Sequence, residues 1–241
     1  MFERANFDPL RATKSDIRNY LKSFADSPPN TYANVLKALR VFYGGYLGRG
    51  EVVEGFRFPS RPLKVITAPS KRELQEFYRW LKEPLAKALL LIYATTGLRR
   101  REVVNLRIGD VDFEKRMVIP RSGSSRTKHT WITFYNEEAE RALRDYLGSF
   151  KNLDKGAKLF PVSEGYFRER CKAFERETGI RITPQILREW FACDMGRLGV
   201  SDRYVDAFCG CVPRSVLARH YADFSPEKLK EIYDRADLKV F

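Results

Sequence analysis

The sequence predicts a mainly helical protein with one small antiparallel β-sheet, divided into a short helical module and a larger second domain. Apolar residues recur at helical spacing through most of the 241 residues, and a hydrophobic fraction of 44% can supply a real core. Two short β-rich runs, 116–121 and 130–134, flank a turn-like segment and predict a hairpin. Residues 56–69 hold three prolines and no helical period, so they predict an extended basic linker, with the domain boundary near Lys64.

Residues 1–64 predict the helical module. Thr13, followed three residues later by Asp16, is placed to cap a first helix whose apolar face is formed by Ile17, Tyr20, Leu21 and Phe24. The segment "SPPN" stops this helix, and Asn30 is placed to cap a second one. Gly44 and Gly45 weaken the continuation of that second helix. The opposite face of the second helix carries Lys37 and Arg40, two candidate DNA contacts.

Residues 65–241 predict the second domain. Ser70 is placed to open a helix, "LAKALLLIYATTG" reads as a buried helix ending at Gly97, and 137–147 is amphipathic. Residues 163–176 predict a strongly basic helix. Ser225 and Pro226 are typical of a helix start, so 226–236 predicts a tail helix that packs either on its own domain or on a neighbouring protomer.

The charge balance favours a polyanionic partner and argues against several other classes. Lys and Arg number 44 against 31 Asp and Glu, which gives a net charge of +13. Four cysteines are too few for a disulfide framework, and membrane-length apolar runs and a signal-peptide core are absent from the sequence, which favours the cytoplasm. Cys209 and Cys211 have C-x-C spacing with one nearby histidine, a pattern that does not predict a metal site.

Four motifs in order carry the functional prediction: "TGLRRREVVNLRIGDVDF" after the buried helix, "RTK" in the hairpin turn, "TPQILREWFA" and "GCVPRSVLARHY". This succession resembles the tyrosine recombinase (phage-type integrase) family, in particular its archaeal viral and plasmid branch. Residues 12–47 are similar to the family's helical core-binding domain, shortened at its front. The resemblance implies a core-binding domain over 1–64 and a mixed α/β catalytic domain over 65–241. It also implies an enzyme that cuts and rejoins double-stranded DNA through a covalent 3′-phosphotyrosyl link.

The resemblance also assigns catalytic residues position by position. Arg99 matches the family's first catalytic arginine and Glu102 its accompanying acidic residue, which we expect to hold the arginine in place. Lys128 matches the lysine of the hairpin turn, Arg188 the second arginine and Tyr221 the nucleophile.

Two positions depart from the family pattern. Gln185 stands where the family usually has histidine, and Cys211 stands where His or Trp usually follows a glycine. Glutamine can hydrogen-bond a phosphate oxygen or orient a phenol, but it cannot accept a proton as imidazole can. Water, the phosphate or His220 are the alternatives, although neighbouring residues on a helix, such as His220 and Tyr221, point to different sides.

These residue types suit phosphodiester cleavage for a physical reason. Attack by a side-chain oxygen creates a phosphorane with extra negative charge, which two guanidinium groups can bind in place of a metal. The phenol must lose its proton, and the departing 5′-oxygen must gain one, which Lys128 can deliver. The phosphotyrosyl link stores the bond energy, so we expect no metal, no ATP and no cofactor.

The partner expected from the resemblance is double-stranded DNA, bound by a protein that is monomeric in solution and a homotetramer on synapsed DNA. Further candidate phosphate contacts are basic residues of the two domains: Lys37, Arg40, Arg100, Arg126, Arg168, Arg170 and Lys172. Two alternative functions stay open, a type IB topoisomerase-like activity and a DNA-binding or regulatory relative that does not cut.

Overall fold

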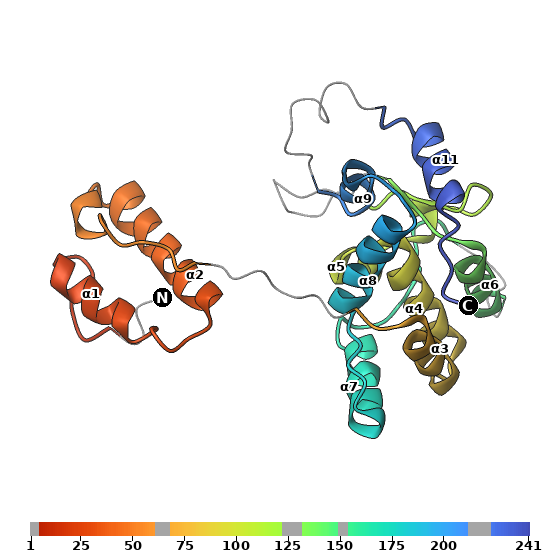
Figure 1. Ribbon diagram of the computed structural model, residues 1–241, viewed down its shortest axis with the longest axis horizontal. Coiled ribbons are helices and arrows are strands. Elements are labelled where there is room, and N and C mark those ends of the chain that lie inside the picture. Colours follow the sequence, from red (N-terminus) through yellow and green to blue (C-terminus); the bar gives the residue numbers. More distant parts are fainter. Residues whose placement is uncertain (1–4, 61–67, 122–131, 149–153, 212–222) are drawn as a thin grey trace. The chain divides into compact units, whose positions relative to one another are not determined.

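The computed structural model describes residues 5–60, 68–121, 132–148, 154–211 and 223–241 (Figure 1). Contacts along the chain divide it into two compact units, Met1–Val65 and Ile66–Phe241. Each unit has its own hydrophobic core. Among the described residues, every helix is too short or too polar to cross a membrane.

The first unit is built on two α-helices and an irregular helical extension. Its elements are α1 (Lys14–Lys22), α2 (Pro29–Arg40), the π-helix η1 (Val41–Tyr46) and the 3₁₀-helix η2 (Gly50–Val52). The predicted cap of α1 is confirmed, because the side chains of Thr13 and Asp16 each accept a hydrogen bond from the other's backbone N–H. Apolar side chains of α1, α2 and η1 form the core, with Ile17, Leu36, Leu39 and Tyr43 fully buried.

The end of α2 differs from the expectation. The chain does not stop its helix at Gly44 and Gly45 but passes into η1, where Leu47 N–H donates to the carbonyl of Phe42, five residues back, at 2.9 Å. The start also lies earlier, at Pro29 rather than after Asn30. Proline suits the first helical turn because its missing N–H has no partner there.

The second unit places one apolar helix at the centre of its fold. Its helices are α3 (Lys71–Trp80), α4 (Pro84–Thr96), α5 (Arg100–Asn105), α6 (Glu137–Leu147), α7 (Tyr166–Thr178), α8 (Pro184–Arg197), α9 (Asp202–Phe208) and α11 (Pro226–Ala236), with the 3₁₀-helix η3 at Ile108–Asp110. Helix α4 is buried along ten of its thirteen residues and packs against both α6 and α8 (Figure 1). The helix predicted to end at Gly97 is therefore the core of this unit.

A three-stranded antiparallel sheet covers the C-terminal end of α4. Its strands β1 (Val111–Asp112), β2 (Met117–Val118) and β3 (Thr133–Phe134) follow the order β1-β2-β3, with Val118 opposite Val111 and Thr133. The Thr133 hydroxyl donates to the carbonyl of Thr96 at 2.6 Å and ties the sheet to α4. The predicted runs contain β2 and β3, whereas β1 lies outside them, beside aspartates that are depleted in strands. The fold class of a mainly helical protein with a small antiparallel sheet is confirmed.

The tail helix α11 folds back on its own unit in this structure. It has the predicted bounds, and the Ser225 side chain caps it by accepting from Lys228 N–H. Leu229 and Tyr233 are buried, and the Tyr233 hydroxyl donates to the carbonyl of Thr95 at 2.7 Å. Burial raises the pKa of the Tyr233 phenol well above its ordinary value. The tail helix therefore joins the same core as α4 and the sheet.

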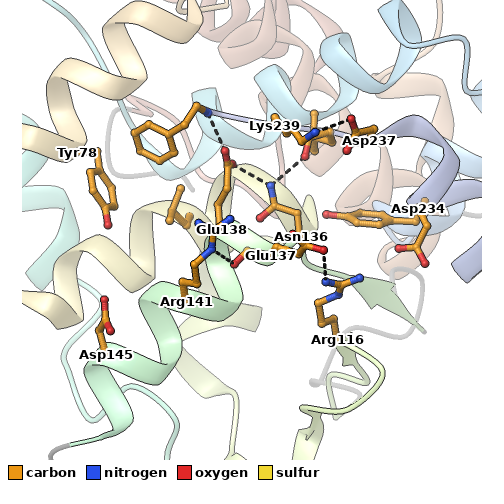
Figure 2. A pocket seen from close by; sticks show the side chains of 14 residues that line it. Tyr78, Arg116, Asn136, Glu137, Glu138, Arg141, Asp145, Asp234, Asp237 and Lys239 are labelled. Carbon is orange, nitrogen blue, oxygen red and sulfur yellow. Dashed lines mark hydrogen bonds and ion pairs between the residues drawn. The ribbon is translucent and has the colours of Figure 1, made fainter.

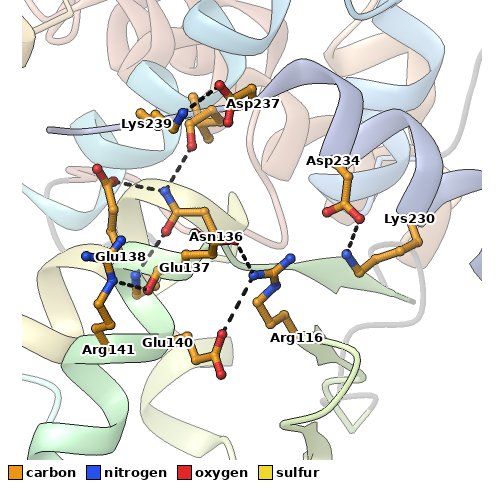
Figure 3. Close-up of polar contacts among 12 residues, drawn as sticks. Arg116, Asn136, Glu137, Glu138, Glu140, Arg141, Lys230, Asp234, Asp237 and Lys239 are labelled. Atoms are coloured by element: carbon orange, nitrogen blue, oxygen red, sulfur yellow. Dashed lines mark hydrogen bonds and ion pairs between the residues drawn. The ribbon is translucent and has the colours of Figure 1, made fainter.

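Three of the last four residues, Leu238, Val240 and Phe241, are held through their backbone (Figures 2 and 3). The amide of Asn136 donates to the carbonyl of Leu238, and both Val240 N–H and Phe241 N–H donate to the Glu138 carboxylate. A cavity of about 870 Å³ lies beside this segment, lined by α3, α6 and the tail. Side chains of both charges line this cavity (Figure 2). The basic ones are Arg116, Arg141 and Lys239, and the acidic ones include Glu137, Asp145 and Asp237. Figure 3 shows that Arg116 is held there by Glu137 and Glu140.

Candidate active site

Arg99 is placed by a sharp turn at the end of α4. Gly97 ends the helix with a φ of 65°, a left-handed conformation that favours glycine. The chain also passes close to α8 here, since a Cβ on Gly97 would lie 2.6 Å from the Phe191 ring and 3.2 Å from Cys209 Sγ. Leu98 is buried, and Arg99 follows as the N-cap of α5.

Glu102 fixes Arg99 at both ends. One carboxylate oxygen of Glu102 accepts the backbone N–H of Arg99 at 2.7 Å, and the other accepts from its Nη1 at 2.9 Å. The carboxylate also lies in the first turn of α5, where negative charge is stabilised by the helix dipole. The contact is the one expected for Glu102, a side chain that orients the arginine.

Arg188 joins three segments of the second unit. The Thr183 side chain caps α8 by accepting from Ile186 N–H at 3.1 Å, which sets the register of the helix. From there the Arg188 guanidinium reaches two carbonyls, with Nη1 donating to Gly97 at 2.5 Å and Nη2 to Cys209 at 2.7 Å. Neutral carbonyls orient the guanidinium without cancelling its charge, so the group stays available to an anion.

Cys211 lies between the two arginines. Its Sγ is 3.8 Å from Arg188 Nη2 and 4.0 Å from Arg99 Nη2, while Arg99 Nη2 also reaches the carbonyl of Gly210 at 3.3 Å. Gly210 adopts a φ of 61°, which lets the chain turn back after α9. Four predicted site residues, Arg99, Glu102, Arg188 and Cys211, are thus brought together by three separate segments.

The neighbouring Cys209 is part of the packing under the site. It is buried, and burial raises the pKa of its thiol to about 11. The positive charge of the Arg188 guanidinium lowers this pKa, but by less than burial raises it. A thiol with this pKa is neutral at physiological pH. Cys209 therefore contributes no charge to the arginine cluster.

Gln185 lies one helical turn before Arg188, at the start of α8. Its side chain is exposed, and its amide donates to Glu189 Oε1 at 3.1 Å. Residues three and four apart share a helix face, so Gln185, Arg188 and Glu189 lie on the same side of α8. Glu189 was not among the predicted site residues. The sequence feature that could have identified Glu189 is its position four residues after Gln185, which places both side chains on one helix face.

The other proposed catalytic side chains lie outside the described residues. These are Tyr221, Lys128 and the alternative base His220, together with Arg126. Residue Arg121, directly before the segment 122–131 that contains Lys128, is described, and its Nε donates to the buried carboxylate of Asp110 at 2.7 Å. The roles of Lys128 and Tyr221 stay predictions.

The basic residues near α7 fall into two groups. Arg170 makes a bidentate ion pair with Glu83 at 2.6 Å and stacks on the Tyr166 ring, 3.5 Å from its centroid. The Arg170 guanidinium lowers the pKa of the Glu83 carboxyl, and burial together with Glu83 raises the pKa of the Tyr166 phenol to about 12. Arg168 and Lys172 are exposed and one turn apart on α7, so they share a face that can meet a phosphate backbone.

Arg100 shares a carboxylate with its neighbour Arg101. Glu164 contacts Arg100 Nη2 at 2.9 Å and Arg101 Nε at 3.2 Å. Both ion pairs are solvent-exposed, and such pairs contribute little to stability because water screens them. A DNA phosphate can replace Glu164 at these arginines at small cost.

The turn at Gly97 gives a first testable prediction. We expect Gly97→Ala to lower the free energy of unfolding by about 1–3 kcal/mol, because the added methyl collides with Phe191 and φ is positive. Chemical denaturation of the purified protein measures this. Gly179→Ala is the matched control, since Gly179 also has a positive φ of 75° but its Cβ would meet no atom within 4 Å. An equal loss in both variants would contradict the close packing at Gly97.

Comparisons with known proteins show the family and the fold of the chain. The second unit has the fold of tyrosine recombinase catalytic domains. The profile of the Phage integrase family matches residues 70–228, which include all the catalytic positions named above. The chain belongs to the phage integrase family, the family of tyrosine-type site-specific recombinases.

Individual relatives are similar along most of the chain. Tyrosine recombinase XerA of Pyrococcus furiosus is 27% identical over 216 residues, which cover 85% of this chain and 73% of the relative. Tyrosine recombinase XerA of Thermococcus onnurineus is 27% identical over 237 residues, which cover 92% of this chain and 82% of the relative.

Solved structures share the fold. The match to a crystal structure of XerA recombinase covers 99% of this chain and 88% of the XerA chain, with a TM-score of 0.54 and 24% identity. A crystal structure of a lambda integrase (75–356) dimer bound to a COC′ core site matches 93% of this chain and 85% of the integrase chain, with a TM-score of 0.69 and 15% identity.

Proposed function

We propose that this protein is a site-specific recombinase that cuts and rejoins double-stranded DNA through Tyr221. The observation that carries the proposal is the arginine cluster, in which Nη2 of Arg99 and Nη2 of Arg188 both lie within 4.0 Å of Cys211 Sγ. Two guanidinium groups that lie this close to one point fit a phosphate group, whose nonbridging oxygens accept hydrogen bonds from guanidinium groups in pairs.

The proposed reaction replaces one phosphodiester by another. The Tyr221 phenolate attacks the phosphorus, the bond to the 5′-oxygen breaks, and a 3′-phosphotyrosyl bond forms. Lys128 supplies the proton that the departing 5′-oxygen takes up, and the charge of the phosphorane is stabilised by Arg99 and Arg188. The reverse attack by a 5′-hydroxyl releases Tyr221 and rejoins the strand, so the bond count is conserved and no energy source is needed.

The phenol proton needs an acceptor other than Gln185. The amide of Gln185 donates to Glu189 Oε1, an arrangement that directs its carbonyl oxygen away from that carboxylate. This carbonyl can accept a hydrogen bond from the phenol and orient it, but it cannot take the proton. In our proposal the proton passes to water or to a phosphate oxygen while the arginine field stabilises the phenolate.

The remaining assignments follow from the family and from charge. We place the chain in the archaeal viral and plasmid branch, and archaeal XerA proteins among its relatives support an archaeal origin. The first unit acts as the core-binding domain, and the protein works in the cytoplasm on double-stranded DNA, with Arg100, Arg126, Arg168 and Lys172 contacting phosphates. It is a monomer in solution and a homotetramer on synapsed DNA.

The test is a covalent trapping assay. Duplexes selected by the wild-type protein from a random library are nicked at successive positions, so that the strand beyond the cut is lost and cleavage becomes irreversible. We expect a protein–DNA adduct that survives denaturing electrophoresis, and exchange of strands between two intact duplexes. Tight binding without any adduct would instead support a non-cleaving relative. Relaxation of supercoiled DNA without strand exchange would support a type IB topoisomerase-like activity.

A further inference from the structure

The Asp110 carboxylate is a buried charge that joins two segments of the second unit. Its side chain is 4% exposed, whereas that of its partner Arg121 is 62% exposed. One carboxylate oxygen accepts the backbone N–H of Arg107 at 2.9 Å, and the other accepts Arg121 Nε at 2.7 Å. A buried carboxylate needs such donors to compensate its lost hydration. The contact with Arg121 is therefore part of the local structure and more than a surface ion pair.

Asp110 ends the 3₁₀-helix η3, which is bonded to a neighbouring loop of the same unit. Gly109 N–H donates to the carbonyl of Lys155 at 2.9 Å. Arg107 Nη1 donates to the carbonyl of Gly156 at 2.7 Å. These contacts fix η3, and with it the place of the Asp110 carboxylate.

Asp110 holds the chain that leads into the segment 122–131 at two points. Ile119 N–H donates to the Asp110 carbonyl at 2.9 Å, and Arg121, the last residue before the segment, reaches the carboxylate. The Ile119 side chain is 47% exposed, so apolar packing contributes little to holding the chain here. The polar contacts of Asp110 therefore set where the chain enters the segment that contains Lys128.

The other end of this segment is held by the sheet and by α4. Ile132 and Thr133 are buried, and the Thr133 hydroxyl donates to the carbonyl of Thr96, the residue before Gly97. Gly97 in turn offers its carbonyl to Arg188. The segment thus starts and ends at fixed points, of which the second adjoins the turn that places the arginines of the site.

We propose that Asp110 and Arg121 are positioning residues, which hold the segment 122–131 so that Lys128 reaches the departing 5′-oxygen. The inference rests on the proposed function, in which Lys128 supplies a proton to that oxygen. As the bond from phosphorus to the 5′-oxygen breaks, its electron pair stays on the oxygen, an N–H bond of Lys128 breaks and an O–H bond forms.

The physical reason is the short range of proton transfer. The donor nitrogen and the acceptor oxygen must come within about 2.6–3.2 Å of each other. A lysine on a chain that is fixed at both ends samples fewer positions than one on a chain that is fixed at one end. Loss of Arg121 frees one end of the segment, so it lowers the share of time that Lys128 spends within reach of the 5′-oxygen.

Direct contact of Arg121 with a DNA phosphate is the alternative role. Its exposed guanidinium carries further N–H donors, which suit a phosphate. Such a contact would contribute to DNA affinity and would not depend on the leaving group. A positioning role acts on one proton transfer, so the chemistry of the leaving group separates the two roles.

The test compares two leaving groups at the same position of the DNA. The full-length protein is given the duplex and the cut position found in the trapping assay, made once with the ordinary 5′-bridging oxygen and once with sulfur in its place. A thiol has a pKa of about 8.5, far below that of an alcohol, so the sulfur leaves as a thiolate without a proton from Lys128. Single-turnover adduct formation is measured at saturating protein, and binding is measured separately.

Arg121→Ala should slow adduct formation by about tenfold or more on the oxygen duplex and leave the rate on the sulfur duplex near that of the wild type. Lys128→Ala should show the same pattern with a larger loss, and adding Arg121→Ala to it should slow cleavage no further. Arg121→Lys keeps the positive charge at Asp110 and should retain most of the rate. Arg144→Ala is the matched control and should cleave both duplexes normally, because Arg144 is an exposed arginine that pairs with another partly buried carboxylate, Glu140, at 2.6 Å.

The possible results separate this inference from the proposed function. An Arg121→Ala variant that cleaves the oxygen duplex at the wild-type rate, or that slows on both duplexes equally, would overturn the positioning role. A wild-type rate combined with weaker binding would assign Arg121 to phosphate contact instead. If sulfur does not rescue Lys128→Ala, the role of Lys128 is wrong and the inference falls with it. A wild-type protein that forms no adduct on either duplex would overturn the proposed function itself.

Discussion

Arg188→Ala should form the covalent DNA adduct at least about 10²- to 10³-fold more slowly than the wild type, the range seen when one preorganised transition-state donor is removed. The guanidinium donates to the carbonyls of Gly97 and Cys209, and its Nη2 lies 3.8 Å from Cys211 Sγ. Since it stabilises charge that develops during attack, its loss should change the cleavage rate far more than DNA affinity. Single-turnover adduct formation at saturating protein measures this.

Two further variants separate chemistry from folding. Arg188→Lys keeps the charge but cannot span both carbonyls and a phosphate, so we expect a loss of the same order with near-normal stability. Arg197→Ala, at the exposed end of the same helix, should cleave normally. Wild-type cleavage by Arg188→Lys would contradict the assignment of Arg188 to the phosphate clamp.

Tyr221→Phe should form no adduct at all while binding DNA as the wild type does. Phenylalanine preserves the ring and removes only the oxygen that would bond to phosphorus. The measurement is adduct formation on the nicked duplex, followed to long times, together with equilibrium binding to the intact one.

Tyr204→Phe is the matched control for that experiment. Tyr204 is half-buried on α9 and packs edge-on against Phe224, with ring centroids 5.8 Å apart. Its hydroxyl has no role in the proposed reaction, so its removal should leave the adduct intact. An adduct that persists in Tyr221→Phe and is lost in Tyr204→Phe would move the nucleophile to another residue.

The sequence predicted most of the second unit because its local signals agree with the packing. The buried helix ending at Gly97, the helix 137–147 and the tail helix 226–236 each combine an apolar face with a recognisable start or stop. Strand β1 escaped prediction because Asp112 and the neighbouring Asp110 and Glu114 are residue types that are depleted in strands.

Four of the proposed site residues could be named from the sequence, but the contacts that hold them could not. The resemblance of the motifs to the recombinase family assigned Arg99, Glu102, Arg188 and Cys211, and the structure brings all four together. The carbonyls of Gly97 and Cys209, which hold Arg188, carry no side-chain signal and appear only when three segments meet. The pairing of Arg170 with Glu83 likewise joins residues 87 positions apart, so the sequence did not indicate it; the phosphate contact predicted for Arg170 stays a prediction.

The N-terminal unit illustrates a second limit. Gly44 and Gly45 predict a weak helix end, and helix propensity gives no sign that the chain continues as a π-helix. That continuation places Tyr46 and Val41 along one groove, an arrangement that α-helical periodicity does not predict.

The most direct test of the account is to locate the covalent bond. The trapped adduct is digested with nuclease and trypsin, and the modified peptide is identified by mass spectrometry. We expect the residual nucleotide on peptide 220–228, "HYADFSPEK", which contains Tyr221 as its one tyrosine. A nucleotide on any other peptide, such as the one beginning at Tyr204, would contradict the account.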